Sequence, residues 1–142
     1  MKISASRISD ARHSLIFDDF FHLSQYIFQD PGLLLQFYVV ELSLFEISAD
    51  YGMNSRLIVA KENPNVGLVI SEGDPAPVSS RPLFTMVVTE IAALFHRLAN
   101  FNFSTGAELL TKQSLFEWPL GQNMTLKDPA GNIFIIERPY AA

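Results

Sequence analysis

The sequence predicts an α+β fold built from two β-α-β-β-β modules. The clearest linker is residues 73–81, where two prolines, two serines and a glycine occur close together. On either side of it, a β-type run leads into a helical run. Asp30 and Glu90 fall between these runs at corresponding places, 60 residues apart, and a spacing of that size suggests an internal duplication. The predicted domain covers residues 22–140, with modules 22–72 and 82–140.

Composition narrows the class of protein. The chain has 142 residues, of which 49% are hydrophobic and 18% charged, so a single domain with a buried core is expected. Its net charge of −5 argues against nucleic acid or an anionic membrane as the main partner. Without cysteine, the chain has no disulfides and no thiolate ligands. Neither a signal peptide nor a transmembrane run is present, so we expect a soluble cytoplasmic protein.

The first module begins with a β-type run at residues 22–30. Asp30 is a plausible helix N-cap, and Pro31 suits the first helical position because its missing N–H costs nothing there. Three further β-type runs follow the helix, at residues 44–50, 56–61 and 66–71. We expect residues 1–21 to be a partly helical appendage outside the modules. An alternative register makes residues 1–9 a strand and 11–21 a helix capped by Asp10, which adds one β-α unit too many.

The second module repeats this order. After a β-type run at residues 82–90, Ile91, Leu94, Phe95 and Leu98 form one apolar stripe at helical spacing, so this helix should pack on a sheet. His96 and Arg97 fall on the opposite face, where we expect solvent. The remaining β-type runs are residues 108–111, 122–126 and 133–137.

Several short motifs add a family resemblance. The most specific is the turn Asp128-Pro129-Ala130-Gly131-Asn132, whose residues suit a tight turn before a final strand. The others are Trp118-Pro119-Leu120-Gly121-Gln122, Phe37-Tyr38, and Leu42-Ser43-Leu44-Phe45-Glu46, in which Ser43 replaces a helix-ending glycine. Over residues 22–140 the chain resembles the vicinal oxygen chelate superfamily, which includes glyoxalase I, bleomycin-resistance proteins and extradiol dioxygenases. The resemblance implies a curved, partly open mixed sheet around a cavity, and a homodimer that sometimes exchanges halves.

The resemblance also implies where metal ligands would lie. In metal-dependent members, His, Gln or Glu ligands come from the first and last strands of each module. The corresponding positions here are Leu23, Leu83 and Ile135, none of which binds metal, while Glu72 follows the end of the remaining strand. A site made of His22 and Glu137 requires slipped registers. We therefore expect no cofactor, with a divalent metal ion as the alternative. In the simpler interpretation, His22 lies at the start of a strand, Glu137 lies at the end of a strand, and both face water.

Strand alternation predicts the lining of a metal-free cavity. Gln25, Leu83, Thr85 and Ile135 are expected to give a mostly apolar pocket, with Phe116 and Trp118 at its mouth and Glu137 on the same face as Ile135. Most of the twelve phenylalanines are core residues by this reasoning, and backbone groups can satisfy Gln25 and Thr85. The predicted ligand-binding residues are Gln25, Leu83, Thr85, Phe116, Trp118, Ile135 and Glu137.

Three classes of function remain open at this point. The favoured one is metal-independent binding of a small, largely apolar or aromatic molecule, as in the bleomycin-resistance branch. The second is a metal-dependent lyase, isomerase or dioxygenase with displaced ligands. The third is a role in assembly, with a vestigial cavity.

Overall fold

A computed structural model describes residues 2–5, 25–27, 31–71 and 80–141 of the chain. The first half contains β1 (Lys2–Ala5), β2 (Gln25–Ile27), α1 (Pro31–Leu35), the π-helix η2 (Gln36–Glu41), β3 (Phe45–Gly52), β4 (Ser55–Ala60) and β5 (Asn63–Ser71). The second half contains β6 (Thr85–Val87), α2 (Ile91–Ala99), β7 (Glu108–Leu109), β8 (Phe116–Trp118), β9 (Gly121–Lys127) and β10 (Ile133–Pro139).

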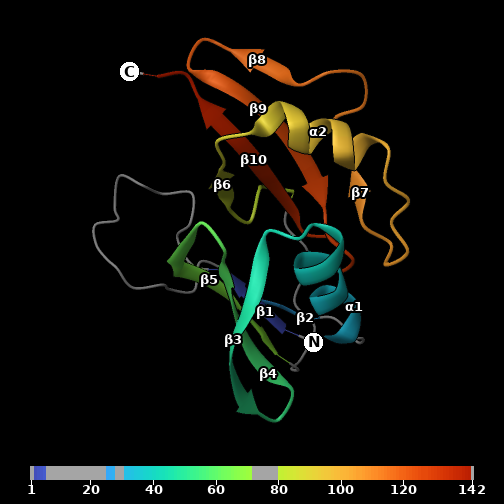
Figure 1. The fold of residues 1–142 in the computed structure, drawn as a ribbon. Helices are drawn as coiled ribbons and strands as arrows, with labels where there is room; N and C mark the ends of the chain where they lie inside the picture. The colour runs from blue at the N-terminus through green and yellow to red at the C-terminus, as the bar shows by residue number, and fades with distance from the viewer. Residues whose placement is uncertain (1, 6–24, 28–30, 72–79, 142) are drawn as a thin grey trace.

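The strands form two sheets, one from each half (Figure 1). The first has the order β2-β1-β5-β4-β3, and the second has the order β6-β10-β9-β7, with β8 also paired to β9. Both halves place a helix after a short first strand and antiparallel strands after the helix, so the predicted α+β class is confirmed. The expected mixed sheet is divided into two, and its parallel pair, β6 with β10, lies in the second half.

The N-terminal strand corrects one prediction. We expected residues 1–21 to lie outside the modules, but Lys2–Ala5 forms β1, which pairs antiparallel with both β2 and β5. Ile3 lies opposite Tyr26 on one side and Ile70 on the other. The edge of β5 is thus occupied by β1, whose backbone groups pair with those of β5. The rest of the predicted appendage, and the alternative helix, lie outside the described residues.

The helix signals agree with the structure at three points. Pro31 is the first residue of α1, although Asp30 lies outside the described residues. Ser43 has φ 62°, which is the left-handed conformation expected where glycine would end the helix. In α2, Ile91 and Leu98 are buried, and Leu94 and Phe95 pack against the core.

Arg97 is exposed, as expected, but its side chain also contacts the first half of the chain. Its guanidinium donates to the carbonyl oxygens of Glu41, at 3.0 Å from Nη1, and of Leu42. These carbonyls lie at the end of η2, where helical backbone acceptors lack intrahelical partners. Arg97 therefore joins α2 to the first half, while His96 is exposed as expected.

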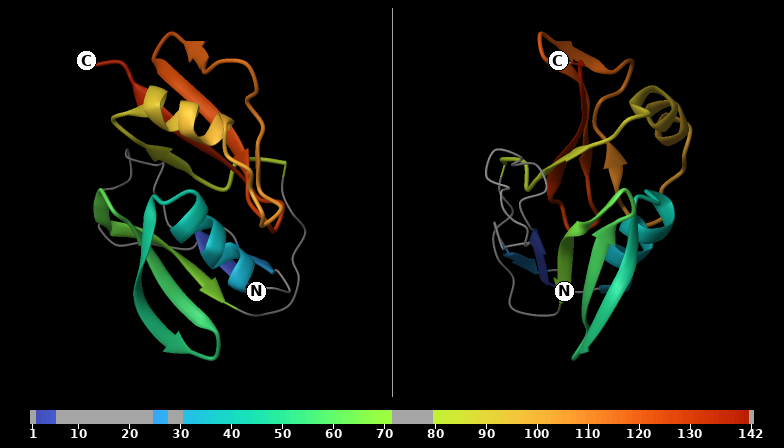
Figure 2. Two further views of the ribbon diagram at one scale, coloured as in Figure 1. Left: turned by 45° about the vertical axis from the view of Figure 1, so that its right-hand side comes forward. Right: turned by 60° about the vertical axis from the view of Figure 1, so that its left-hand side comes forward.

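One hydrophobic core joins the two halves, which lie one above the other in both views of Figure 2. Tyr38, fully buried in η2, lies between Phe45 of the first sheet and Phe134 of the second, with ring centroids 5.5 and 5.7 Å away. Phe134 in turn stacks on Phe84 at 4.9 Å. Since both sheets contribute side chains to this core, the other face of the second sheet is left to line a site.

Asp128 connects the turn before β10 to the first half. Its carboxylate, 1% exposed, accepts hydrogen bonds from Tyr38 Oη at 2.7 Å and Asn132 Nδ2 at 3.0 Å. It also accepts the backbone N–H groups of Ala130 and Asn132. Burial raises the pKa of Asp128, and the hydrogen bonds oppose that rise. Burial and the neighbouring carboxylate hold the pKa of Tyr38 well above its ordinary value.

Within the described residues, none of the helices is long and apolar enough to span a membrane.

Candidate functional site

The second sheet has one face turned away from the core. Met86, Ile136 and Met124 point into the core, so their neighbours along each strand point the other way. The pairing register arranges these neighbours in rows across the sheet. We call this surface the open face, and it consists of Thr85, Val87, Phe116, Trp118, Asn123, Thr125, Ile135 and Glu137.

A break in the edge strand forms a hollow on this face. β7 and β8 both pair with β9 but leave a gap beside Thr125. There the backbone N–H of Thr125 donates to Thr111 Oγ1 at 3.0 Å, so a side chain replaces a ladder partner. The cavity at this gap measures about 730 Å³, within the range of small-molecule sites. It is lined by Thr111, Ser114, Leu115, Phe116, Glu117, Asn123 and Thr125.

Two aromatic residues of β8 border the hollow. Phe116 leaves 58% of its surface exposed, although it lies beside Asn123 in the sheet. Trp118 is half-buried, and its indole N–H is buried without an acceptor in the part of the chain that the structure describes. A buried donor without a partner is costly, so an acceptor supplied from outside would stabilise it.

Gly121 lets the start of β9 lie close to the end of β10, directly opposite Trp118 of β8. A Cβ at this position would lie 2.5 Å from the carbonyl oxygen of Arg138 and 2.9 Å from Pro139 Cα. Such contacts are shorter than van der Waals separations, so glycine is required by the close approach of β10. The geometry of the hairpin, and with it the position of both aromatic residues, depends on this residue.

Five of the seven predicted ligand-binding residues share the open face. Thr85 pairs with Ile135, and two residues further along β10 Glu137 pairs with Asn123 of β9. Asn123 pairs in turn with Phe116, and Trp118 lies two residues beyond Phe116. Of the seven, Phe116 lines the hollow itself.

The other two predicted residues lie elsewhere. Leu83 was expected to face the cavity, but it is 5% exposed and belongs to the buried core. It precedes β6, so the alternation of that strand does not extend to it. Gln25 lies in β2, an edge strand of the first sheet, and strand pairing does not bring it to the open face.

The described residues of this region do not bring together a set of metal ligands. The ligand positions implied by the resemblance are held by Leu83, which is buried, and by Ile135. Glu137 does share the face of Ile135, as predicted, but its neighbours across the sheet are Val87 and Asn123. Among the described residues, no three histidine or acidic side chains come together, and His22 lies outside them.

The sequence analysis missed most of the hollow's lining. Alternation along residues 121–127 was available to place Asn123 and Thr125 on one face, since Met124 and Leu126 are plainly apolar. Ser114 and Leu115 had no such signal, and Thr111 was predicted to end a strand, whereas all three lie in the break between β7 and β8. The lining is consequently more polar than the mostly apolar pocket that was expected.

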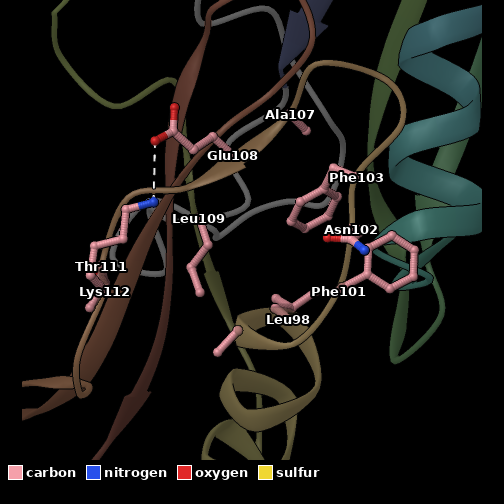
Figure 3. Close-up of a pocket in the computed structure, with 10 residues that line it drawn as sticks. Leu98, Phe101, Asn102, Phe103, Ala107, Glu108, Leu109, Thr111 and Lys112 are labelled. Atoms are coloured by element: carbon pink, nitrogen blue, oxygen red, sulfur yellow. Dashed lines mark hydrogen bonds and ion pairs between the residues drawn. The ribbon is translucent and has the colours of Figure 1, made fainter.

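A smaller cavity of about 270 Å³ lies between the end of α2 and β7 (Figure 3). Figure 3 shows its charged residues, Glu108 and Lys112, paired with each other, at 3.2 Å. That pairing lowers the pKa of Glu108. None of the predicted ligand-binding residues lines this cavity, so the hollow on the open face is the better candidate.

Comparison with solved structures identifies the fold. TnmS3, an antibiotic binding protein from Streptomyces sp. CB03234, is similar with a TM-score of 0.63 and 20% identity, over 81% of this chain and 91% of that one. A glyoxalase/bleomycin resistance protein from the same organism has a TM-score of 0.57 and 23% identity, over 81% and 95%. FosX, a fosfomycin resistance protein from Listeria monocytogenes, has a TM-score of 0.57 and 12% identity, over 80% and 88%.

No protein-family model matches the sequence, and no curated protein is significantly similar to it. At these identities the structural similarity shows the fold and nothing finer. The chain therefore has the vicinal oxygen chelate fold, as the sequence motifs implied.

Proposed function

We propose that this protein binds a small planar aromatic molecule in the hollow of the open face, without a metal ion. The observation that carries this proposal is the hollow itself, about 730 Å³ in size and bordered by the exposed ring of Phe116. Exposed aromatic rings beside a cavity offer a stacking surface at low entropic cost. Hydroxyl and amide groups of Thr111, Ser114 and Asn123 would orient the molecule.

The structural neighbours support binding rather than a particular chemistry. TnmS3 is an antibiotic binding protein, and FosX is a fosfomycin resistance protein. A binding role suits the open face, because its side chains supply a ring, hydroxyls and amides. A metal-dependent reaction of the kind considered above has no matching set of ligands among the described residues.

Replacing Trp118 by alanine is expected to weaken binding of planar aromatic compounds about tenfold, through lost stacking and a lost donor. Phe116→Ala should have a similar effect. The measurement is the ligand-induced shift in melting temperature, using proflavine, anthracene carboxylate and anthracene methanol as probes. Phe101→Ala is the control, because Phe101 is also exposed but lies outside the open face. Absence of any shift in the wild-type protein would refute the proposal.

We also propose a homodimer in which a second copy covers part of the open face. Val87, on the open face, and Leu120, in the turn between β8 and β9, are 50% and 63% exposed, and apolar groups left open in this way favour association. Sedimentation velocity should show a dimer at about micromolar concentration, and Val87→Asp with Leu120→Asp should give a monomer. Met53→Asp is the matched control, since Met53 is 92% exposed at the tip of the β3–β4 hairpin. A wild-type monomer at all concentrations would contradict the dimer.

A further inference from the structure

Glu137 is a half-buried acid in the middle of the open face. Across the sheet it lies between Val87 and Asn123, and along β10 it follows Ile135 by two residues. Its carboxylate has no hydrogen bond or ion pair with any other residue of the described chain. Removing a carboxylate from water in part, without a partner, is unfavourable, so Glu137 would gain from a cation placed beside it.

The lysines near this face are already paired. Lys127 lies at the far end of β9, with Nζ 3.7 Å from Glu108, and Lys112 binds the same carboxylate at 3.2 Å. No lysine or arginine lines the hollow. Glu117, which does line it, accepts the phenol of Tyr140 at 3.0 Å. Arg138, the next residue of β10, points to the opposite face. Among the described residues of the open face, the carboxylate without a partner is thus that of Glu137.

The position of Glu137 suits a ligand held in the hollow. Phe116, Asn123 and Glu137 lie in one row across β8, β9 and β10. Adjacent strands are about 4.8 Å apart, so Glu137 is roughly 10 Å from Phe116 along the sheet. A molecule of three fused rings can contact the Phe116 ring at one end and reach the carboxylate at the other.

We infer that the ligand of the open face is a planar aromatic molecule carrying a positively charged amine, with Glu137 as the partner of that amine. This inference rests on the proposed binding function and adds the charge of the ligand. It also assigns a role to the acidic residue that sequence reasoning connected to a metal ion. The ring lies against Phe116, and the amine donates to the Glu137 carboxylate beside Asn123.

The test compares three planar probes, each built on three linearly fused six-membered rings, that differ in charge. Proflavine is cationic, anthracene carboxylate is anionic and anthracene methanol is neutral. After dialysis against chelator, titration followed by fluorescence should show proflavine binding about tenfold tighter than the carboxylate. Glu137→Gln should weaken proflavine binding about fivefold and leave anthracene methanol unchanged. Added salt should weaken proflavine binding to the wild type more than to Glu137→Gln.

Glu62→Gln is the matched control, because it removes the same charge from an exposed residue between β4 and β5. It should change the affinity for none of the three probes. Equal binding of all probes, still dependent on Phe116, would overturn the role of Glu137 while leaving the binding function intact. Binding of none would overturn both. Proflavine binding that is lost with chelator, and that Ni²⁺ or Zn²⁺ restores in the wild type but not in Glu137→Gln, would instead make Glu137 a metal ligand and would overturn the inference.

Discussion

Asp128→Ala is expected to lower the free energy of unfolding by about 4 kcal/mol, the largest effect of any substitution proposed for this chain. The carboxylate accepts four hydrogen bonds at a site that is 1% exposed, and two of the donors are the side chains of Tyr38 and Asn132. Alanine leaves these donors buried without an acceptor, and each such group costs about 1–3 kcal/mol. Urea unfolding followed by circular dichroism measures the loss.

Tyr38→Phe provides a milder variant if Asp128→Ala does not fold. It removes one hydrogen bond of 2.7 Å to the carboxylate, and keeps the ring between the two sheets. We expect a loss of about 1.5–3 kcal/mol, the range for hydrogen bonds to charged groups. Asp50→Ala is the control, because Asp50 lies in an exposed hairpin and pairs with Arg56 at 3.5 Å on the surface. Equal effects at Asp128 and Asp50 would contradict the account.

The contact between Tyr38 and Asp128 should also make the stability of the protein depend on pH. Burial raises the pKa of Asp128, so the folded state holds this proton to a higher pH than the unfolded chain. Its contribution to stability is complete below the unfolded pKa of about 3.9, and is lost as the pH rises through the folded pKa. The Tyr38 hydroxyl opposes the rise, so Tyr38→Phe should raise the pKa further. Its destabilisation should therefore increase with pH, and a constant difference would contradict this.

Local patterns in the sequence were enough to predict most elements of the fold. The apolar stripe of Ile91 and Leu98 predicts the buried face of α2 because helical spacing is a property of neighbouring residues. The turn at Asp128 was recognised for the same reason. That its carboxylate accepts the hydroxyl of Tyr38, 90 residues earlier, was not predictable, because no local pattern encodes that contact. β1 was missed likewise: four residues carry little periodicity, and the partner β5 is distant in sequence.

On the open face, too, local patterns predicted the regular strands and missed the features that depend on distant contacts. Alternation places Thr85, Ile135 and Glu137 correctly, since side chains alternate wherever a strand is regular. It fails at Leu83, which precedes the strand and packs in the core. The hollow depends on the break between β7 and β8, and neither strand was predicted with its observed bounds. The contact of Arg97 with the end of η2 was not predicted, because a helical face turned away from its own sheet can still meet the other half of the molecule.

Glu41→Ala is expected to cost about 3 kcal/mol, at a second connection between the halves. Glu41 is 3% exposed at the end of η2, and its carboxylate accepts three hydrogen bonds from the loop after α2. Ser104 donates its backbone N–H at 2.8 Å and its hydroxyl at 2.9 Å, and Thr105 donates its hydroxyl at 2.6 Å. Loss of the acceptor leaves these donors in a largely buried position, so urea unfolding should show a clear decrease.

The loop contacts of Glu41 can be separated from its other effects. A double-mutant cycle of Glu41→Ala with Ser104→Ala should give a coupling energy of about 1–2 kcal/mol, because the two residues share direct hydrogen bonds. Hydrogen exchange at the Ser104 amide should become faster in Glu41→Ala, since that amide loses its acceptor. Glu46→Ala, on the exposed part of β3, should change neither quantity.

Glu41→Ala should lower the stability of the protein without changing its affinity for ligand. Glu41 contacts the loop at Ser104 and Thr105, whereas the hollow is lined from Thr111 onward and by β9. At temperatures well below the melting transition, Glu41→Ala should therefore bind proflavine as the wild type does, despite its lower stability. Loss of binding in folded Glu41→Ala would mean that the hollow depends on the connection between the halves, and that the open face is not an independent site.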